Sequence, residues 1–413
     1  MIERKNHEID RELKNEFYNE LGLYIHIPFC VKKCDYCDFL SAPATKEVRE
    51  QYVKALLNEI ESYQELAKSY MVATIFIGGG TPSSLEVGLI KQIMNKIHQI
   101  FSLKKGAEIT IEINPGTINK EKLMEYQEAG INRISFGLQS ANDTELKLLG
   151  RLHNYMQFEE NYKLARKLGF ANINVDLMSA LPGQTLSTWE ETLNKVLSLK
   201  PDHISAYSLI IEEGTKFHER YQETAIGYKE LPDEETDRQM YHRTKEILEE
   251  FGYYRYEISN YAKPGYECSH NKSYWIGTPY LGLGLGASSL LNGRRFTKLN
   301  ELQEYIKVCQ IPLNSLQDGI TDIEPMKLIA EYEALTLSQR MEEFMYLGLR
   351  LCEGVKKSEF LRRFSVDMMD IYGEVMEELK KKAVLMEDGD IVRLSEYGID
   401  VSNSILYLFL KDD

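Results

Sequence analysis

Residues 73–97 read ATIFIGGGTPSSLEVGLIKQIMNKI, and this stretch shows the unit from which much of the chain is built. A short run of β-branched and aromatic residues predicts a buried strand that ends in three glycines. A helix is then expected, with Thr81 as its N-cap and Pro82 as its first residue, or with Ser83 and Glu86 as a capping box. One face of this helix carries the apolar residues Leu85, Leu89, Ile93 and Ile97.

The same order of strand and helix recurs along the first half of the chain. Short connections between alternating strands and helices favour a parallel sheet. Roughly six such units fit between residues 21 and 215, which is compatible with a barrel, a partial barrel or an open doubly wound sheet. The expected strands cover residues 21–28, 73–80, 108–116, 132–140, 171–183 and 203–215. The expected helices cover residues 46–66, 81–97, 119–130, 155–169 and 187–199, the last opened by a capping box of Ser187 and Glu190.

The alternation ends near residue 230, and the rest of the chain has a different character. We expect a charged lead-in (1–20), a core of strand–helix units (21–232), a core-associated segment rich in Tyr and Gly (233–300), and a C-terminal domain (301–413). The C-terminal domain combines helices with a hairpin, which is predicted from the turn dipeptide Asp388–Gly389. This pattern resembles a small winged-helix module, and a packing role without nucleic acid is the simpler interpretation.

The composition is that of an ordinary globular protein, and its 413 residues suggest about two or three domains. Lys and Arg number 49 and Asp and Glu 64, so the formal charge of −15 argues against a general nucleic-acid binder. The apolar runs are far shorter than the ~20 residues of a membrane span, and the charged N-terminus resembles neither a signal nor a transit peptide. We therefore expect a cytoplasmic protein with reduced thiols and no stable membrane insertion.

Three cysteines lie close together in the segment YIHIPFCVKKCDYCDF (residues 24–39), at positions 30, 34 and 37. Three thiolates suit an iron–sulfur cluster, and three ligands on a four-iron cluster leave one iron open to a chelating cofactor. A zinc site would need a fourth ligand, for which His26 is the near candidate. The charges of Lys32 and Lys33 should lower the thiol pKa values and help ligation.

The spacing of Cys30, Cys34 and Cys37 is also that of one helical stripe, so three buried structural cysteines are the alternative. Pro28 and the charged residues of the segment oppose this alternative, because a buried helix rarely carries them. The cysteines also follow a strand directly, where binding loops lie in α/β folds. The cysteines outside the segment are expected to be small buried hydrophobes: Cys268, Cys309 and Cys352.

A second group of candidates lies on or just after the later strands. A parallel barrel carries its site at the C-terminal ends of its strands, and a polar residue in a buried strand needs a partner. Glycines before Thr81 let the backbone approach a ligand, and a helix N-terminus favours a carboxylate; an ordinary tight turn is the alternative. The polar candidates are Glu112, Gln139, Arg151 and Asp176, with a space-filling salt bridge between Glu112 and Arg151 as the alternative.

The CX3CX2C pattern, with an aromatic residue before its last cysteine, resembles the radical S-adenosylmethionine (SAM) superfamily. This resemblance implies a partial (β/α)6 barrel and a 4Fe–4S cluster held by Cys30, Cys34 and Cys37. It also implies that the amino and carboxylate groups of SAM chelate the open iron. One electron then cleaves SAM into methionine and a 5′-deoxyadenosyl radical.

A set of short segments in a fixed order resembles one branch of that superfamily, the oxygen-independent coproporphyrinogen III oxidase-like proteins. The segments are YIHIPFC, GGGTPS, IEINPG, RISFGLQS, LGRLH, LPGQT, HISAYSL and YEISN…HNKSYW. The resemblance implies that Tyr36 packs beside the cluster. It also implies that SAM is contacted by Tyr24, Gly79, Gly80, Thr81, Glu112, Gln139, Arg151 and Asp176.

Two features separate the chain from the oxidases of that branch. The oxidases carry a further cysteine two residues after the third ligand, where this chain has Phe39, and they carry a longer segment before Tyr24. HNKSYW instead resembles a motif of the HemW-type haem chaperones. That resemblance implies a haem site with His270, Tyr274 and Trp275, since histidine is a common axial haem ligand. The alternative is that His270 hydrogen-bonds the barrel rim while the two aromatic residues pack.

The expected function is therefore haem binding and transfer to an acceptor protein by a radical SAM-type 4Fe–4S protein. Whether the protein is an enzyme stays open, because two alternatives remain. One is SAM-dependent oxidative decarboxylation of coproporphyrinogen III, and the other is an iron–sulfur interaction protein without SAM turnover. The partners implied are haem or a porphyrinogen, the acceptor protein, and an electron donor such as a flavodoxin or ferredoxin, with no nucleic acid.

Overall fold

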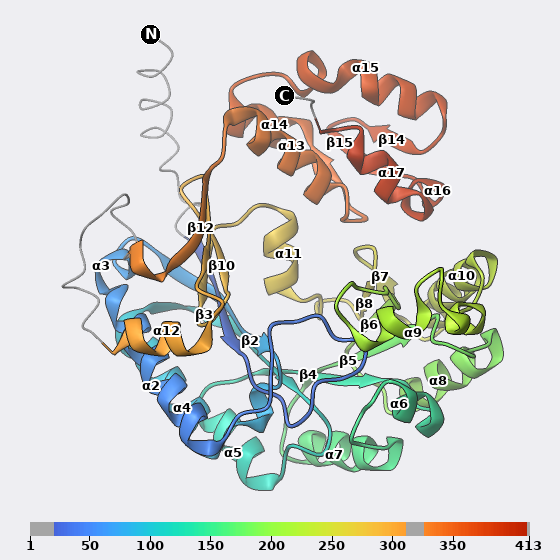
Figure 1. The fold of residues 1–413 in the computed structure, drawn as a ribbon. Helices are drawn as coiled ribbons and strands as arrows, with labels where there is room; N and C mark the ends of the chain where they lie inside the picture. The colour runs from blue at the N-terminus through green and yellow to red at the C-terminus, as the bar shows by residue number, and fades with distance from the viewer. Residues whose placement is uncertain (1–19, 311–325, 411–413) are drawn as a thin grey trace.

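The computed structural model describes residues 20–310 and 326–410, so the predicted lead-in lies outside the described residues except for Glu20. Six parallel strands run side by side in chain order, and at least one helix follows each of them (Figure 1). The sheet that they form is not closed, which confirms the prediction of a partial (β/α)6 barrel. The strands are β1 (Glu20–Ile27), β2 (Met71–Gly79), β3 (Ser102–Ile113), β4 (Arg133–Gln139), β5 (Asn172–Ser179) and β6 (His203–Ser208).

The barrel helices cover the outer side of these strands (Figure 1). The apolar faces of most of these helices share one core with the strands, because parallel strands covered by helices are buried on both faces, whereas Phe217 and Tyr221 of α9 belong to a separate cluster. Leu23 and Ile25 of β1 are fully buried, as are Ile93 and Ile97 on the inner face of α4. The helices are α2 (Lys46–Ser62), α3 (Gln64–Ala67), α4 (Leu89–Ile100), α5 (Lys120–Glu128), α6 (Asp143–Leu148), α7 (Tyr155–Lys167), α8 (Leu186–Ser198), α9 (Lys216–Tyr221) and α10 (Glu234–Glu250), with the 3-10 turns η1 (Pro82–Ser84) and η2 (Ile226–Glu230).

The sheet continues beyond both ends of the six parallel strands. β9 pairs with β1 in parallel and β10, β11 and β12 follow it antiparallel, while β8 and then β7 extend the other edge. These strands are β7 (Tyr254–Arg255), β8 (Asn260–Ala262), β9 (Tyr280–Leu283), β10 (Ser288–Leu291), β11 (Arg294–Lys298) and β12 (Ile329–Ala334). The helices of this region are α11 (Ser269–Trp275) and α12 (Leu302–Cys309), with the 3-10 turn η4 (Met326–Leu328). The predicted domain limits stay predictions; β11 and β12, which lie on either side of the limit at residues 300 and 301, pair in one sheet.

The helix expected over residues 81–97 is wrong in its first half. Only the short turn η1 follows Thr81, and α4 begins at Leu89. The Ser83 hydroxyl forms no capping box, because it accepts a hydrogen bond from the Asn114 N–H (3.1 Å) of the next βα unit. Gly88 then adopts a left-handed backbone conformation with a φ of 93°, which no continuous helix from Thr81 could contain. The Glu125 carboxylate of α5 accepts the free N–H groups of Gly88 (2.9 Å) and Lys91 (3.1 Å) at the start of α4.

The capping box at the start of α8 is formed by other residues than the expected Ser187 and Glu190. Thr185 caps the helix and Thr188 bonds back to it, so α8 starts two residues earlier than a Ser187 cap requires. The Glu190 carboxylate instead accepts a hydrogen bond from Arg243 of α10 (2.6 Å). The tertiary contact with Arg243 therefore uses the Glu190 side chain that the predicted capping box required.

The C-terminal domain has the helix–strand–helix–helix–strand–strand order of a winged helix and its own apolar core. Its sheet runs in the order β13-β15-β14, and the predicted hairpin is confirmed, with Gly389 at a φ of 59°. The elements are α13 (Leu337–Gly348), β13 (Val355–Lys356), α14 (Lys357–Phe364), α15 (Met368–Lys381), β14 (Leu385–Asp388), β15 (Ile391–Leu394), α16 (Glu396–Asp400) and α17 (Ser402–Tyr407). Within residues 20–310 and 326–410, no helix has the length and apolarity needed to cross a membrane.

Candidate functional site

A cavity of about 350 Å³ opens where the parallel strands end, and we call it the cluster cavity. All three cysteines of the CX3CX2C segment line it, together with most of the residues expected to contact SAM. The predicted residues brought together here are Cys30, Cys34, Tyr36, Cys37, Gly79, Gly80, Thr81, Glu112, Gln139, Arg151 and Asp176. Tyr24 lies instead in a second cavity of about 280 Å³, the inner chamber, which Glu112 and Asp176 also line.

The loop that carries the cysteines is not helical, so the alternative of a buried helical stripe is wrong. Its base is held by Ala42, which accepts a hydrogen bond from the Cys30 N–H (3.2 Å) and donates one to the Pro28 carbonyl (3.0 Å). Two side chains from other units reach the thiols: the Thr81 hydroxyl lies 3.4 Å from Cys30 Sγ. Arg151 Nη1 lies 3.5 Å from Cys34 Sγ.

The donor set of the cluster cavity fits a polynuclear cluster better than a zinc ion. His26 is not available as a fourth ligand, because its ring nitrogens bond to the Leu40 carbonyl (2.9 Å) and the Tyr24 hydroxyl (3.1 Å). Among the described residues, no three His, Cys, Asp or Glu side chains lie close enough to hold one metal ion. A four-iron cluster spreads its thiolates more widely than one ion does, so three thiols around one cavity suit it. The expected lowering of thiol pKa values is wrong for Cys37, whose pKa is raised by burial.

The three glycines after β2 allow close approach of two backbones. A Cβ on Gly80 would lie 2.7 Å from the Phe29 carbonyl, and the Gly80 N–H donates to the Ile27 carbonyl at 2.9 Å. Gly79 has a φ of 107°, and a Cβ there would lie 2.5 Å from the His26 ring. The expected tight turn is therefore present, and it presses the end of β2 against the cysteine loop. The Gly79 N–H also donates to the Glu112 carboxylate (3.1 Å) and so orients it.

Two half-buried carboxylates, Glu112 and Asp176, line both the cluster cavity and the inner chamber. Burial, and then the nearby charge of Asp176, raise the pKa of Glu112 to about 8. Burial also raises the pKa of Asp176, although its oxygens accept hydrogen bonds from Asn174 (2.7 Å) and Ser135 (3.0 Å). Groups of this kind are stabilised in their charged form by a bound cation or by hydroxyl donors.

Arg151 does not form a space-filling salt bridge with Glu112, so that alternative is wrong. Its Nη2 donates to Asn114 Oδ1 (2.6 Å) and to the Gly137 carbonyl, and its buried Nε has no partner among the described residues. Gln139 holds a left-handed backbone with a φ of 75°, and its side-chain oxygen accepts a hydrogen bond from the Tyr207 hydroxyl (2.8 Å). Sequence reasoning missed Asn114 and Tyr207, although both lie at strand ends of the kind already singled out.

The residues expected to bind haem are only partly brought together. His270 and Tyr274 line the inner chamber, whereas Trp275 packs against Arg350 of the C-terminal domain at 4.6 Å. Both ring nitrogens of His270 have partners, the Thr74 hydroxyl (2.8 Å) and the Tyr274 hydroxyl (3.0 Å). Burial, and then the charge of Arg133, lower the pKa of His270 to about 3, so the ring is neutral. This arrangement is the one expected if His270 has a structural role.

Comparison with known proteins shows which family has this sequence. The model of the radical SAM superfamily matches residues 24–196, and the model of the HemN C-terminal domain matches residues 335–401. A heme chaperone HemW of Lactococcus lactis is 35% identical over 94% of this chain and 97% of its own length. The HemW proteins of Bacillus subtilis and Escherichia coli are 35% and 36% identical over similar shares. The chain belongs to the HemW family of radical SAM proteins.

The fold is shared more widely than the family. The solved structure of the Escherichia coli coproporphyrinogen III oxidase, described as a radical SAM enzyme, superposes with a TM-score of 0.79 at 22% identity. It covers 98% of this chain and 93% of its own, so the C-terminal domain is included. For this HemW-family protein, membership of the radical SAM superfamily implies a 4Fe–4S cluster and SAM, which the donor set of the cluster cavity fits.

Proposed function

We propose that this HemW-family protein is a haem chaperone that binds haem and passes it to an acceptor protein in the cytoplasm. The observation that carries the proposal is the match to chaperones named HemW at 35% identity over nearly the whole of both chains. An electron donor of the flavodoxin or ferredoxin type would serve the cluster. The formal charge of −15 supports a role without nucleic acid.

The proposal assigns the cluster to Cys30, Cys34 and Cys37, and SAM to the same cavity. When bound, the cluster supplies one electron to SAM. The Glu112 carboxylate would accept a hydrogen bond from the amino group of SAM, because a hydrogen-bond donor favours the charged form of such an acid. Asp176 would accept hydrogen bonds from ribose hydroxyls, with Gln139, Gly79, Gly80, Thr81 and Tyr24 as further contacts. Arg151 would hold the cysteine loop from the side of Cys34.

An oxidase function is the second candidate, and the fold favours it only in general terms. Likeness at 22% identity shows the fold and not the reaction. Phe39 lines the cluster cavity at the position where the oxidase branch carries a further cysteine, and its side chain is 63% exposed. The third candidate, an iron–sulfur interaction protein without SAM turnover, predicts neither haem transfer nor SAM cleavage.

The test uses the full chain with an anaerobically reconstituted cluster. Ferric haem is titrated into the protein, and the haem-loaded protein is mixed with a haem-free apocytochrome while absorbance follows the transfer. A parallel reaction contains coproporphyrinogen III, SAM and a strong reductant. We expect stoichiometric haem binding, transfer to the apoprotein and no protoporphyrinogen. Formation of protoporphyrinogen without haem transfer would replace the proposal by the oxidase function.

A further inference from the structure

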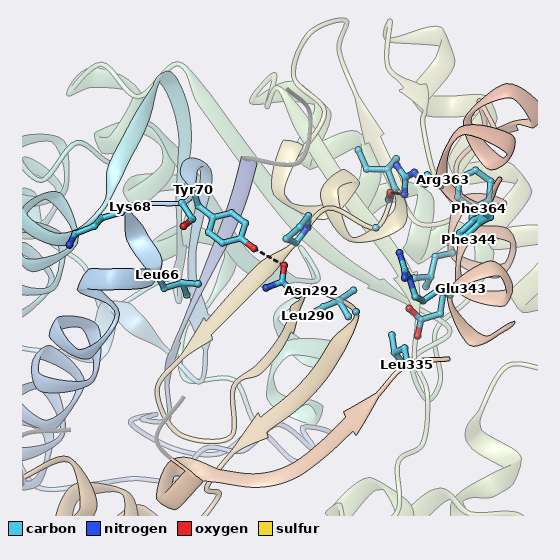
Figure 2. A pocket seen from close by; sticks show the side chains of 17 residues that line it. Leu66, Lys68, Tyr70, Leu290, Asn292, Leu335, Glu343, Phe344, Arg363 and Phe364 are labelled. Atoms are coloured by element: carbon cyan, nitrogen blue, oxygen red, sulfur yellow. Dashed lines mark hydrogen bonds between the residues drawn. The ribbon is translucent and has the colours of Figure 1, made fainter. Parts of the chain in front are cut away.

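A large cavity outside both chambers lies between the barrel and the C-terminal domain. It measures about 830 Å³, which is within the range of small-molecule sites, and we call it the interdomain cavity. One wall comes from the chain before β2 and from the β10–β11 hairpin, and the facing wall comes from α13 and α14 (Figure 2). Its floor includes Ile276 and Gly277, which directly follow the HNKSYW segment.

Both walls of the interdomain cavity carry apolar and aromatic side chains, beside polar and charged ones. Figure 2 shows Phe344 and Phe364 on the side of the C-terminal domain and Leu290 with Tyr70 on the side of the barrel. Tyr70 is fixed by a hydrogen bond from its hydroxyl to Asn292 Oδ1 (3.2 Å). Ile276 is 45% exposed although it is apolar. Apolar walls that face one another across an open space suit a flat apolar ligand.

One cation in this cavity has no partner of its own. Lys68 pairs with Glu65 (2.7 Å), and Arg363 pairs with Glu359 (2.6 Å). Glu343, one turn beyond Arg340 on α13, is already paired with Arg295 (2.7 Å). The guanidinium of Arg340 makes no hydrogen bond or ion pair with the described residues, and it lies beside Gly293 at the cavity wall. A half-buried free guanidinium is well suited to bind a carboxylate in two parallel hydrogen bonds.

We infer that the interdomain cavity is the haem site of this protein, with the macrocycle between the apolar walls and a propionate on Arg340. Haem combines a flat apolar ring with carboxylates on one edge, which is the combination that this cavity offers. The inference rests on the proposed function and adds the place at which the cargo is held. It separates that place from the inner chamber, where His270 has both nitrogens engaged.

The chemistry of the lining gives the site a spectroscopic signature. The described residues that line the interdomain cavity include no histidine, cysteine or methionine. Haem held there has no imidazole or sulfur ligand among these residues; the Lys68 amine is ion-paired with Glu65 (2.7 Å), and Tyr70 supplies the nearest phenolic oxygen. We therefore expect ferric haem bound to the full chain to be high-spin by electron paramagnetic resonance. A low-spin spectrum, typical of nitrogen or sulfur axial ligands, would overturn the assignment.

The decisive experiment measures haem affinity of the reconstituted full chain and of four variants. Arg340→Gln removes the free cation, and Leu335→Trp fills the cavity from the side of the C-terminal domain. Their matched controls are Lys381→Gln, on exposed α15, and Leu337→Trp, which is 49% exposed and outside the lining. We expect about tenfold weaker binding for the first two variants, the scale of one charge-assisted hydrogen bond, and less than twofold change for the controls. Circular dichroism checks that each variant is folded.

A second ligand shows whether Arg340→Gln weakens binding by loss of the carboxylate contact or by a general change in the shape of the site. Haem dimethyl ester keeps the ring but lacks both carboxylates. It should bind the wild type about tenfold more weakly than haem does, and Arg340→Gln should weaken it no further. If the wild type binds haem but Arg340→Gln and Leu335→Trp bind it equally well, the assignment of the site is wrong and the chaperone function stands. If the wild type binds no haem, the chaperone function itself fails and the assignment fails with it.

Discussion

The cluster cavity and the interdomain cavity differ in how they are built. In the cluster cavity, polar side chains from successive βα units fix one another, as with the pair of Gly79 and Glu112 and the contact between Arg151 and Cys34. In the interdomain cavity, two apolar cores meet and leave one guanidinium, that of Arg340, without a partner among the described residues. The first design suits a cofactor that stays in one geometry, and the second suits a cargo that must leave.

The helix α11 connects the inner chamber, beside the cluster cavity, to the interdomain cavity. His270 and Tyr274 face the inner chamber beside the cluster cavity, and the residues that follow the helix line the interdomain cavity. The HNKSYW segment therefore lines the inner chamber and leads directly into the residues that line the interdomain cavity, and its His270 has both ring nitrogens engaged.

Removal of one cluster thiol should have the largest effect. Cys30→Ala should reduce the iron bound after reconstitution from about four atoms per chain to near none, because the open iron leaves no spare ligand. Iron and sulfide analysis with the visible absorbance of the cluster provides the measurement. Cys352→Ala is the matched control, since this half-buried cysteine lies in the C-terminal core. Full iron content in Cys30→Ala would remove the cluster from this cavity.

His270 should matter for stability at acid pH. Its pKa is lowered from 6.5 to about 3 in the folded protein, so the neutral ring contributes stability above pH 6.5 that is lost as the pH falls toward 3. Between pH 6.5 and pH 4 the wild type should lose about 3 kcal/mol more than His270→Gln. Urea unfolding at both pH values gives the difference.

Two comparisons control the experiment on His270. His98→Gln, on the exposed face of α4, is the matched surface control. The haem affinity of folded His270→Gln should equal that of the wild type. A tenfold loss of haem affinity in this variant would move the cargo to the inner chamber and break the proposed separation.

Glu112 should make SAM binding depend on pH. With a pKa of about 8, its carboxyl must release a proton before it can bind the SAM amino group as a carboxylate, so affinity should rise with pH. Between pH 6 and pH 7.5 the gain should be about 20-fold for the wild type. Glu112→Gln should bind SAM weakly with a flat pH profile in equilibrium dialysis. Equal pH profiles for the two proteins would show that Glu112 does not bind the amino group.

Phe39→Cys should have the smallest effect. The side chain is 63% exposed at the cluster cavity, so its replacement should change the free energy of unfolding by no more than about 0.5 kcal/mol. Iron content and SAM affinity should match the wild type, and coproporphyrinogen III should remain unconverted. Protoporphyrinogen formation by this variant would show that one residue divides the chaperones from the oxidases.

The sequence predicted the parts of the molecule that are local or repeated. The six strand–helix units follow from apolar periodicity, and the cysteine loop could be recognised because thiols at this spacing are rarely structural. The inner polar residues Glu112 and Asp176 were found because a charge within a buried strand demands a reason. Their grouping then followed from the rule that parallel strands end on one side.

The features that sequence reasoning missed depend on contacts between distant segments. Ser83 does not cap a helix because Asn114, a residue of the next unit, uses its hydroxyl. Trp275 does not join His270 and Tyr274 at the inner chamber, because Arg350 of the C-terminal domain stacks on its ring. The interdomain cavity joins Tyr70 to Arg340, and no local pattern links residues so far apart.

The most direct test of this account is the haem affinity of the cluster-free Cys30→Ala protein compared with the reconstituted wild type. If cofactor and cargo occupy separate cavities, the two proteins should bind ferric haem within about threefold of each other, since no energetic coupling above ~1 kcal/mol is expected. A loss of tenfold or more on removal of the cluster would contradict the account and place haem in or against the cluster cavity.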